Sequence, residues 1–557
     1  MESNRSDDTS QSIPEVKITA SNSWLTSIWR NFLDFSNMFK AFIGTNYMGL
    51  PFGIAQSGLG PGLAIMIIVA VITDHCCHLI VDCKKIVVDR LVTRRIIKSN
   101  NDTNYQNTTE IVSEQSVREE VETKLTYGDI GLEAMGVWGL RLVNIALLIS
   151  QFGFCINYII FLGNTLGTIF PIEANYTNTS VYYLQIEDRN TSNKSLLIHN
   201  LPSGQSTQPA FVFLALIPLP LLILTSYSRN IRQLGFSSVV ANSSLMVGFI
   251  MVLVFILRDF KVHSGIKWVN WATSFVFFGQ MTGAYEGIGT IIPIESSMKG
   301  NRHRFGLMLH LAIGFMTLWF IALGILGYLR YGNDVNQIIL ESLPRNNVIY
   351  KIVTIFLCVG VVFTFPLQVF VPIEILEDPT CKFFNKLWRK CVYTSSTHHD
   401  TISDPSQPLL RGDLGSSSPT AINNTSLLCR NGNSVKVNNI MVVKHYKFYF
   451  RINLSLYPLT GKQVTTWQRN IFRTIIVLII FAIGIVFKND YVYFSSLIGA
   501  LSSTVVAYIL PCLFHLRLKS ADISLPVKIK DSLLIIFGIG AGTVSVVISI
   551  LKIVNQN

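Results

Sequence analysis

Charged residues are scarce in this chain of 557 residues: Asp, Glu, Lys and Arg together make up 14%, while half of the residues are apolar. Such a composition is typical of proteins with several membrane spans. The polar segments between the apolar runs are too short or too polar to bury a core of their own. The net charge of +12 arises from Lys and Arg in short loops between the runs, so we expect no nucleic-acid partner.

Sequence signals of the common enzyme and metal-site classes are missing as well. There is no glycine-rich phosphate loop, and the nine cysteines lack metal-type spacing, since Cys76 and Cys77 are adjacent within an apolar run. The first 34 residues contain no apolar core of a cleaved signal peptide. We therefore expect no enzyme, no cofactor and no metal, and we predict a disordered cytosolic tail over residues 1–34, with a short amphipathic segment around Trp24 and Trp29.

Eleven apolar runs have the length of a membrane-spanning helix, which needs about 20 residues. They cover about 37–57, 62–83, 138–168, 210–227, 234–257, 272–294, 306–329, 348–376, 470–487, 492–514 and 531–553. We therefore predict an all-α integral membrane protein whose eleven-span core occupies residues 35–557.

The distribution of Lys and Arg predicts the orientation, because cytosolic loops carry an excess of both. Six of them follow the second span between Lys84 and Lys98, whereas the outer loop 170–209 has only two. That loop also contains four glycosylation acceptors, namely Asn175, Asn178, Asn190 and Asn193. We therefore expect a cytosolic N-terminus, a glycosylated lumenal or extracellular loop, and a C-terminus on that same outer side.

A long polar insert, residues 377–466, lies between the eighth and ninth spans and is predicted to be cytosolic. Its first part, CKFFNKLWRKC, alternates basic and aromatic residues, a pattern that favours contact with anionic membrane lipid. From Tyr446 the apolar residues alternate with polar ones, which predicts a strand. Short stretches beginning at Asp404 and Tyr449 resemble sorting signals, so we expect endolysosomal membranes, with the plasma membrane as the alternative.

Two of the spans contain helix-weakening residues at membrane depth. The run 275–294 has Glu286 near its middle, and the first span is interrupted in a similar way. The residues concerned are Gly283, Gly287, Gly289 and Pro293 in one run, and Gly44, Gly49, Pro51 and Gly53 in the other. A charge at bilayer depth costs roughly 3 kcal/mol or more unless it faces a cavity or a partner. Two broken spans in corresponding places indicate the binding site of an inverted-repeat transporter; a kinked packing helix with a protonated Glu286 is the alternative.

Several of these runs carry a family resemblance. FFGQMTGAYEGIGTIIPIESSMK, KAFIGTNYMGLPFGIAQSGL and SQFGFCINYIIFLGN resemble the proton-coupled amino acid transporters of the amino acid/auxin permease superfamily. The resemblance covers nearly all the spans and neither the insert nor the hydrophilic ends. It implies the leucine-transporter-like fold of two five-helix inverted repeats plus one extra helix. It also implies uptake of small neutral amino acids together with a proton.

The resemblance further implies where the substrate binds. The substrate carboxylate would meet the backbone N–H groups freed where the first span unwinds, and the α-amino group would meet carbonyls freed in the sixth span. The predicted substrate-binding residues are Gly44, Thr45, Asn46, Gly49, Tyr285, Glu286, Gly287 and Gly289. Glu286 is the first candidate for proton coupling, because a buried carboxyl binds a proton more readily. His310 is the second candidate.

The chain departs from the family pattern at three places. Asn46 stands where the family usually has a second glycine, and Asn37 aligns with a histidine of the proton-coupled members. Neither outer loop, 170–209 nor 331–347, contains the cysteine of the disulfide that many relatives have. Substrate size and proton coupling therefore stay open at this point. A transporter-like amino acid sensor that signals through the insert is the alternative from another functional class.

Overall fold

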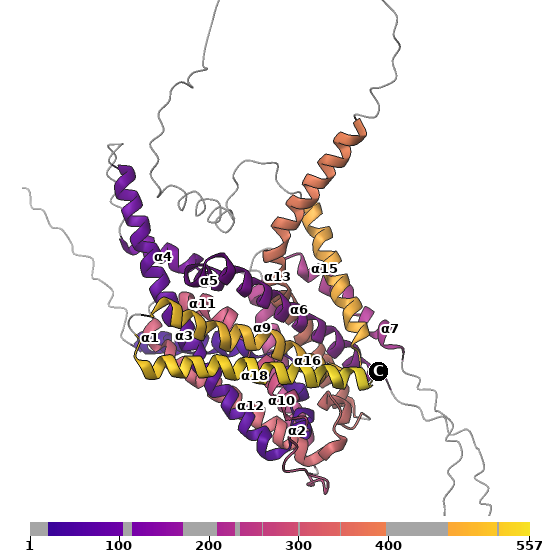
Figure 1. Cartoon of the computed structure of the whole chain (residues 1–557). Coiled ribbons are helices and arrows are strands. Elements are labelled where there is room, and N and C mark those ends of the chain that lie inside the picture. Colours follow the sequence, from indigo (N-terminus) through magenta and orange to yellow (C-terminus); the bar gives the residue numbers. More distant parts are fainter. Residues whose placement is uncertain are drawn as a thin grey trace, which may run out of the picture. The chain divides into compact units, whose positions relative to one another are not determined.

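The computed structural model describes residues 21–103, 114–170, 209–228, 234–258, 260–298, 301–345, 347–396, 466–520 and 523–556. The chain divides into two units, one formed by Met1–Ile373 with Arg473–Asn557 and the other by Glu374–Phe472. Helices build all the regular structure of these described ranges (Figure 1). The four predicted glycosylation sites, the strand expected from Tyr446 and the two sorting-signal stretches lie outside them.

Within the described ranges, eight helical stretches are long and apolar enough to cross a membrane. They are α3 (Leu59–Thr103), α6 (Val137–Gly167), α9 (Leu234–Leu257), α12 (Phe305–Tyr331), α13 (Val348–Ser396), α15 (Thr466–Val486), the stretch from α16 to α17 (Tyr491–Leu518) and α18 (Leu525–Gln556). The prediction of an all-helical integral membrane protein is therefore confirmed.

The other three predicted spans fold as shorter helical pieces. The first contains the end of α1 (Ser21–Phe42), then η1 (Asn46–Gly49) and α2 (Leu50–Ser57). The fourth is divided at Pro218 into α7 (Phe211–Leu216) and α8 (Leu219–Ser226), and the sixth into α10 (Ser274–Ala284) and α11 (Ile288–Ser297). Glycine and proline weaken helical hydrogen bonding at these places, so the two spans predicted to be broken are broken.

Several helices extend further into polar sequence than predicted. α1 begins at Ser21, inside the segment expected to be disordered, and α13 continues to Ser396, into the predicted insert. Two unpredicted helices, α4 (Glu114–Lys124) and α5 (Tyr127–Met135), precede α6. Local polar contacts explain them: Lys124 binds Glu120 one turn earlier at 2.8 Å, and Thr126 and Asp129 form a capping box at the start of α5.

The broken helix α10 lies at the centre of the first unit, where it packs against α2, α3, α16 and α18. Its closest approach is to η6 (Gly499–Ser503), the π-helical turn that follows α16 (Tyr491–Ile498). A Cβ atom added at Gly499 would lie 1.9 Å from the carbonyl oxygen of Gly279, so the two backbones touch. The second π-helical turn, η7 (Val505–Ile509), continues into α17 (Leu510–Leu518). The helices around the sixth-span break are therefore held at backbone contact distance.

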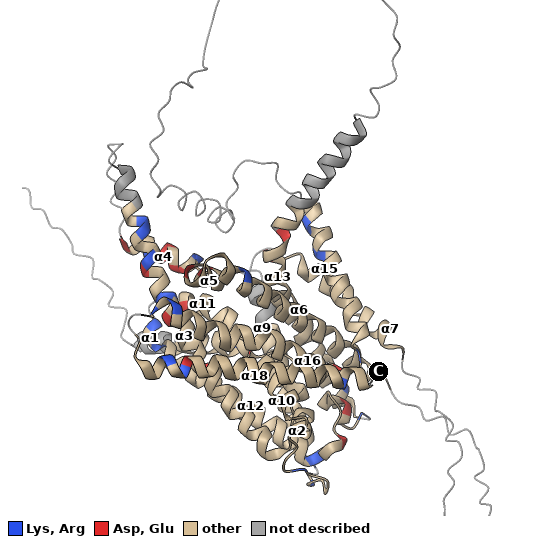
Figure 2. Ribbon diagram, in the orientation of Figure 1, with Lys and Arg blue, Asp and Glu red and all other residues tan. Residues whose placement is uncertain are grey.

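Most charged residues of the first unit lie toward the ends of its helices, and the middle parts of the helices carry few of them (Figure 2). Short turns connect the helices there: η3 (Arg302–Arg304), η4 (Gly332–Asp334) and η5 (Ile339–Ser342). This distribution suits a bundle surrounded by lipid. In the second unit, the described segments are helical, and Arg469 lies 3.4 Å from Glu377.

Candidate functional site

The break after α1 leaves backbone donors without partners. In the described structure, the N–H groups of Gly44, Thr45 and Asn46 donate to no protein acceptor. The carbonyl of Thr45, by contrast, accepts a hydrogen bond of 2.8 Å from the hydroxyl of Tyr491. A buried N–H group without a partner costs free energy, and three such groups in succession are suited to binding an anionic group.

The break between α10 and α11 leaves acceptors rather than donors. The carbonyls of Tyr285 and Glu286 accept no hydrogen bond from any described residue, whereas the Gly287 carbonyl accepts one from the Thr290 N–H at 3.0 Å. Gly287 lies directly against the end of α1, because a Cβ there would be 2.8 Å from the carbonyl oxygen of Ala41. Glycine is therefore required at this position for the two broken helices to meet.

The carboxylate of Glu286 is held by neutral hydroxyl groups. Ser150 of α6 donates to one oxygen at 3.0 Å, and Ser503 of η6 donates to the other. Glu286 is only 9% exposed. No Lys, Arg or His in the described ranges forms an ion pair with it. Its hydrogen-bonding groups are therefore satisfied in part, while its charge has no counter-charge in the protein.

A small cavity lies between the two breaks. It has a volume of about 20 Å³, enough for about one water molecule. Its lining residues are Ala41, Phe42, Ile43, Gly44, Thr45, Asn46, Phe154, Tyr158, Glu286 and Gln368. Four of the predicted site residues, Gly44, Thr45, Asn46 and Glu286, are thus brought together. The cavity is too small for an amino acid in the described conformation.

Two amide side chains that the sequence interpretation did not include complete this region. Asn157 of α6 donates to the side-chain oxygen of Asn46 at 3.2 Å, and Gln280 of α10 donates to its carbonyl at 3.4 Å. The remaining side-chain oxygens of both amides, and the hydroxyl of Thr45, are buried without a hydrogen-bond partner in the described structure. The only sequence signal for these residues was a polar side chain deep in an apolar run.

Other predicted site residues do not line the cavity. The hydroxyl of Tyr285 is 2.7 Å from that of Thr317 on α12, so this side chain ties two helices together. Added Cβ atoms at Gly49 and Gly289 would meet neighbouring helices, at 2.7 Å from Gln280 Nε2 and 3.2 Å from Leu147, respectively. These glycines allow close packing around the breaks.

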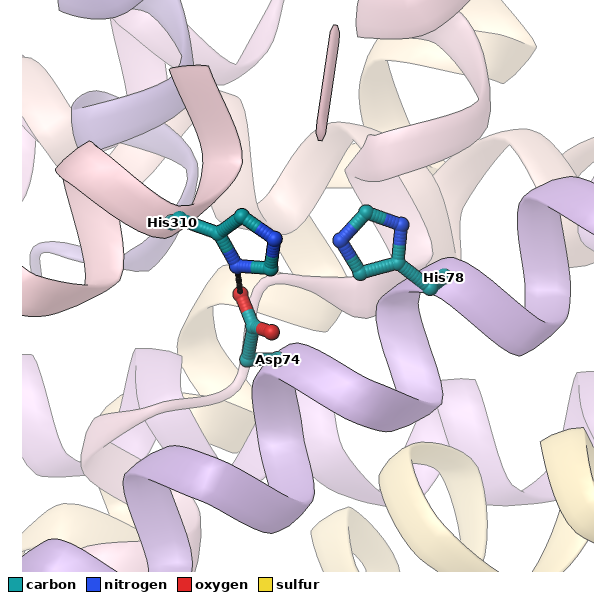
Figure 3. Close-up of side chains that lie close together, drawn as sticks. All are labelled: Asp74, His78 and His310. Carbon is teal, nitrogen blue, oxygen red and sulfur yellow. Dashed lines mark hydrogen bonds and ion pairs between the residues drawn. The ribbon is translucent and has the colours of Figure 1, made fainter. Parts of the chain in front are cut away.

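His310 lies in a different cluster. Its Nδ1 is 2.8 Å from Asp74 of α3, and its ring centre is 4.9 Å from that of His78 (Figure 3). None of its interactions in the described structure involves a residue of either break. Nothing in its contacts connects His310 to the carboxylate of Glu286.

A second group of buried charges lies on α11. Lys84 of α3 forms an ion pair with Glu295 and donates to the hydroxyl of Ser296 at 2.6 Å. Arg302 lies 3.8 Å from Glu295 and forms an ion pair with Glu122 of α4. The group joins α3, α4, α11 and η3 at one end of the broken helix.

A bundle of apolar helices in which two broken helices leave backbone donors and acceptors unpaired is typical of a multi-pass membrane protein, with a candidate binding site at the breaks. Comparison with known families agrees with this class. The chain belongs to the family described as transmembrane amino acid transporter protein, the amino acid/auxin permease family, which matches residues 26–105 and 103–551. The resemblance seen in the sequence is thereby confirmed at the level of this family.

Individual relatives are similar over most of this chain. The vacuolar amino acid transporter 4 of Saccharomyces cerevisiae is 27% identical over 75% of this chain, which matches only 48% of the yeast protein's length. The amino acid transporters AVT3C and AVT3B of Arabidopsis thaliana are 29% and 28% identical, over 65% and 62% of this chain and 73% and 71% of their own lengths.

Proposed function

We propose that this protein is a secondary transporter that moves small neutral amino acids across a membrane together with protons. The observation that carries the proposal is the placement of three free N–H groups, at Gly44, Thr45 and Asn46, and one unpaired carboxylate, Glu286, on a common cavity. An amino acid zwitterion has charges of both signs on neighbouring atoms. A site with anion-binding donors on one wall and a carboxylate on another matches that pattern.

In this proposal the substrate carboxylate binds to the N–H groups after α1. The ammonium group of the substrate binds to the free carbonyls of Tyr285 and Glu286 and to the Glu286 carboxylate. Three aromatic side chains, Phe42, Phe154 and Tyr158, line the same cavity, and they restrict the room for a substrate side chain. The small cavity must widen before an amino acid enters. Alternating access in a fold of two five-helix repeats with eleven spans would provide this change.

The surroundings of Glu286 support the proposed proton coupling. With hydroxyl donors only, the carboxylate takes up a proton when no cation is near and releases it when the substrate ammonium arrives. Substrate and proton occupancy are therefore linked, and the linkage is reciprocal. A serine hydroxyl donates to a carboxylate and accepts from a carboxylic acid, so Ser150 and Ser503 accommodate both states.

A second function, amino acid sensing, has one observation in its favour. Residues Glu374–Phe472 form a unit separate from the transport bundle, as a signalling element would. A sensor binds the amino acid without net movement across the membrane. Flux of radiolabelled amino acid in proteoliposomes distinguishes the two functions.

The proposed topology places the N-terminus in the cytosol, the loop 170–209 in the lumen or outside the cell, and the C-terminus on the same outer side. The vacuolar name of the yeast relative favours an endolysosomal membrane over the plasma membrane. Endoglycosidase treatment tests this topology: single Asn→Gln variants at positions 175, 178, 190 and 193 should include ones that lose a mobility shift. A glycan on Asn424, in the predicted cytosolic insert, would contradict it.

The experiment that tests the function is uptake by the purified full chain in liposomes, measured against a panel of amino acids with and without an inward proton gradient. We expect accumulation of small neutral amino acids that depends on the gradient. Uptake that does not depend on the proton gradient would show that the protein is a transporter without proton coupling. Binding without uptake of any amino acid would establish the sensor instead.

A further inference from the structure

Three chemistry-bearing side chains outside the binding site lie together where α3 packs against α12. Asp74 and His78 are four residues apart, so they project from the same face of α3, and His310 reaches them from α12. One ligand atom from each of the three residues lies within 4.8 Å of the others. No residue of the cluster belongs to the cavity between the helix breaks.

The two imidazole rings face each other in this cluster. The Nδ1 atom of His310 is hydrogen-bonded to the Asp74 carboxylate at 2.8 Å. Its other ring nitrogen points toward a nitrogen of His78 (Figure 3). The Nε2 atom of His78 is buried and has no hydrogen-bond partner among the described residues. A buried nitrogen without a partner costs free energy, and no hydrogen bond joins the two rings in the described structure. An ion between the rings would give the His78 nitrogen a partner.

We propose that this cluster is a binding site for a divalent transition-metal ion, with Zn²⁺ as the preferred ion. The Nε2 atoms of His78 and His310 are the protein ligands. In this proposal the Nδ1–H of His310 donates to the Asp74 carboxylate, so the lone pair of the ring lies on Nε2. The same arrangement of carboxylate, histidine and metal occurs in many metal sites. Protein atoms leave one side of the cluster uncovered, since the His310 side chain is 58% exposed. Water that reaches this side from the polar end of the bundle would complete the coordination.

The spacing of the ligand atoms, within 4.8 Å of one another, is not far from the spacing that the ion needs. Zinc binds imidazole nitrogen at about 2.0 Å with tetrahedral geometry, so two ligand atoms stand roughly 3.3 Å apart. Imidazole is a preferred ligand of zinc and its neighbours in the first transition series, whereas Mg²⁺ and Ca²⁺ prefer oxygen. His310 lies in the second turn of α12, roughly 8 Å along the axis from its start, and the basic turn η3 precedes that start. The site is therefore close to the polar end of the bundle.

Binding would join α3 to α12 through an ion. This property is independent of the proposed transport function, because no residue of the binding cavity takes part. Each ligand must lose any bound proton to bind the metal, so the affinity should fall as the pH is lowered.

The test is a zinc titration of the purified full chain in detergent, freed of metal with a chelator and then competed against a chromophoric chelator. We expect one Zn²⁺ per chain. His78→Gln and His310→Gln should each weaken binding at least 100-fold, and Asp74→Asn about 10- to 100-fold. His303→Gln is the matched control, because His303 is exposed on η3 and outside the cluster; it should bind as the wild type does.

Two further readouts keep the proposal testable if a glutamine variant folds poorly. His310→Cys supplies another zinc ligand, so it should retain binding and fold as the wild type does. Saturating zinc should raise the melting temperature of the wild type and of His303→Gln, and not that of His78→Gln. The proposal is overturned if the wild type binds no zinc, or if the double variant His78→Gln/His310→Gln binds as much zinc as the wild type.

Discussion

Glu286 and Glu295 are two buried carboxylates on the same broken span, and their surroundings are opposite. Glu295 is paired with Lys84 and has Arg302 at 3.8 Å. Among the described residues, the Glu286 carboxylate receives hydrogen bonds only from Ser150 and Ser503. A carboxylate that forms ion pairs with buried cations already has its counter-charges. A carboxylate that accepts hydrogen bonds from neutral hydroxyls can still bind a new cation or a proton. Glu295 is therefore suited to holding helices together, whereas Glu286 is suited to a ligand that binds and leaves.

The ammonium group of Lys84, the ion-pair partner of Glu295, is fully hydrogen-bonded. Lys84 donates to Glu295, to Ser296 and to the carbonyl of Ile292. The hydroxyl of Ser296 in turn contacts the carbonyl of Glu122 at 3.0 Å. All three donors of the ammonium group are used, which is what a buried cation needs in order to be tolerated.

The largest stability effect is expected where this network loses the cation of Lys84. Lys84→Met removes the ion-pair partner of the buried Glu295 and leaves Arg302, at 3.8 Å, as the cation near it, so the fold should be destabilised by about 3–5 kcal/mol. Thermal unfolding of purified protein in detergent measures the change. The double variant Lys84→Met/Glu295→Leu should recover most of the loss, because both charges are then absent.

Lys85→Met is the matched control for that experiment. Lys85 pairs with Asp82 on the exposed face of α3, where an ion pair contributes little. Equal destabilisation by Lys84→Met and Lys85→Met would show that the buried network is not what stabilises this end of the bundle.

A medium effect is expected at the binding cavity, where Asn46 replaces the glycine usual in the family. Asn46→Gly removes the side chain that Asn157 contacts and widens the cavity. The relative uptake of a larger over a smaller neutral amino acid should rise about tenfold, the size of effect that one small group in a pocket produces. Competition uptake in proteoliposomes measures the ratio, with the exposed Asn37→Ala as control. An unchanged ratio would place Asn46 outside the substrate's surroundings.

A smaller effect is expected at a third carboxylate, Glu341 in η5, which lies outside the membrane-spanning segments. Burial raises the pKa of Glu341 from its usual value near 4.5 to about 7, although Arg345 lowers it in part. The folded chain therefore holds this proton more tightly than the unfolded chain does. The resulting stability is fully present below about pH 4.5 and is lost as the pH rises through about 7.

Glu341→Gln should abolish that pH dependence. Its melting temperature should exceed that of the wild type by a few degrees at pH 8 and show no such gain at pH 4. Thermal unfolding at both pH values checks the expectation. A gain of the same size at both pH values would show that the carboxyl does not titrate as described.

The sequence predicted the parts of the molecule that depend on local pattern. Apolar length located the helices, and glycines located the two breaks, because both signals act within one segment. The partners of Glu286 were not predicted, since Ser150 and Ser503 come from helices far away along the chain. Ser502 and Ser503 looked equivalent in sequence, yet Ser502 donates to the carbonyl of Ala146 and only Ser503 reaches the carboxylate. The proximity of His78 and His310 was likewise not predicted, because it depends on how α3 and α12 pack.

In the proposed mechanism, Glu286 couples proton movement to substrate movement. The most direct measurement is proton entry into proteoliposomes that contain a pH-sensitive dye, triggered by an external amino acid that the wild type accumulates. Glu286→Gln keeps the shape of the side chain and removes its titration, and Glu341→Gln is the matched control. We predict that the wild type and Glu341→Gln acidify the interior, whereas Glu286→Gln does not and still exchanges internal for external amino acid. Substrate-driven acidification of normal size in Glu286→Gln would contradict the account.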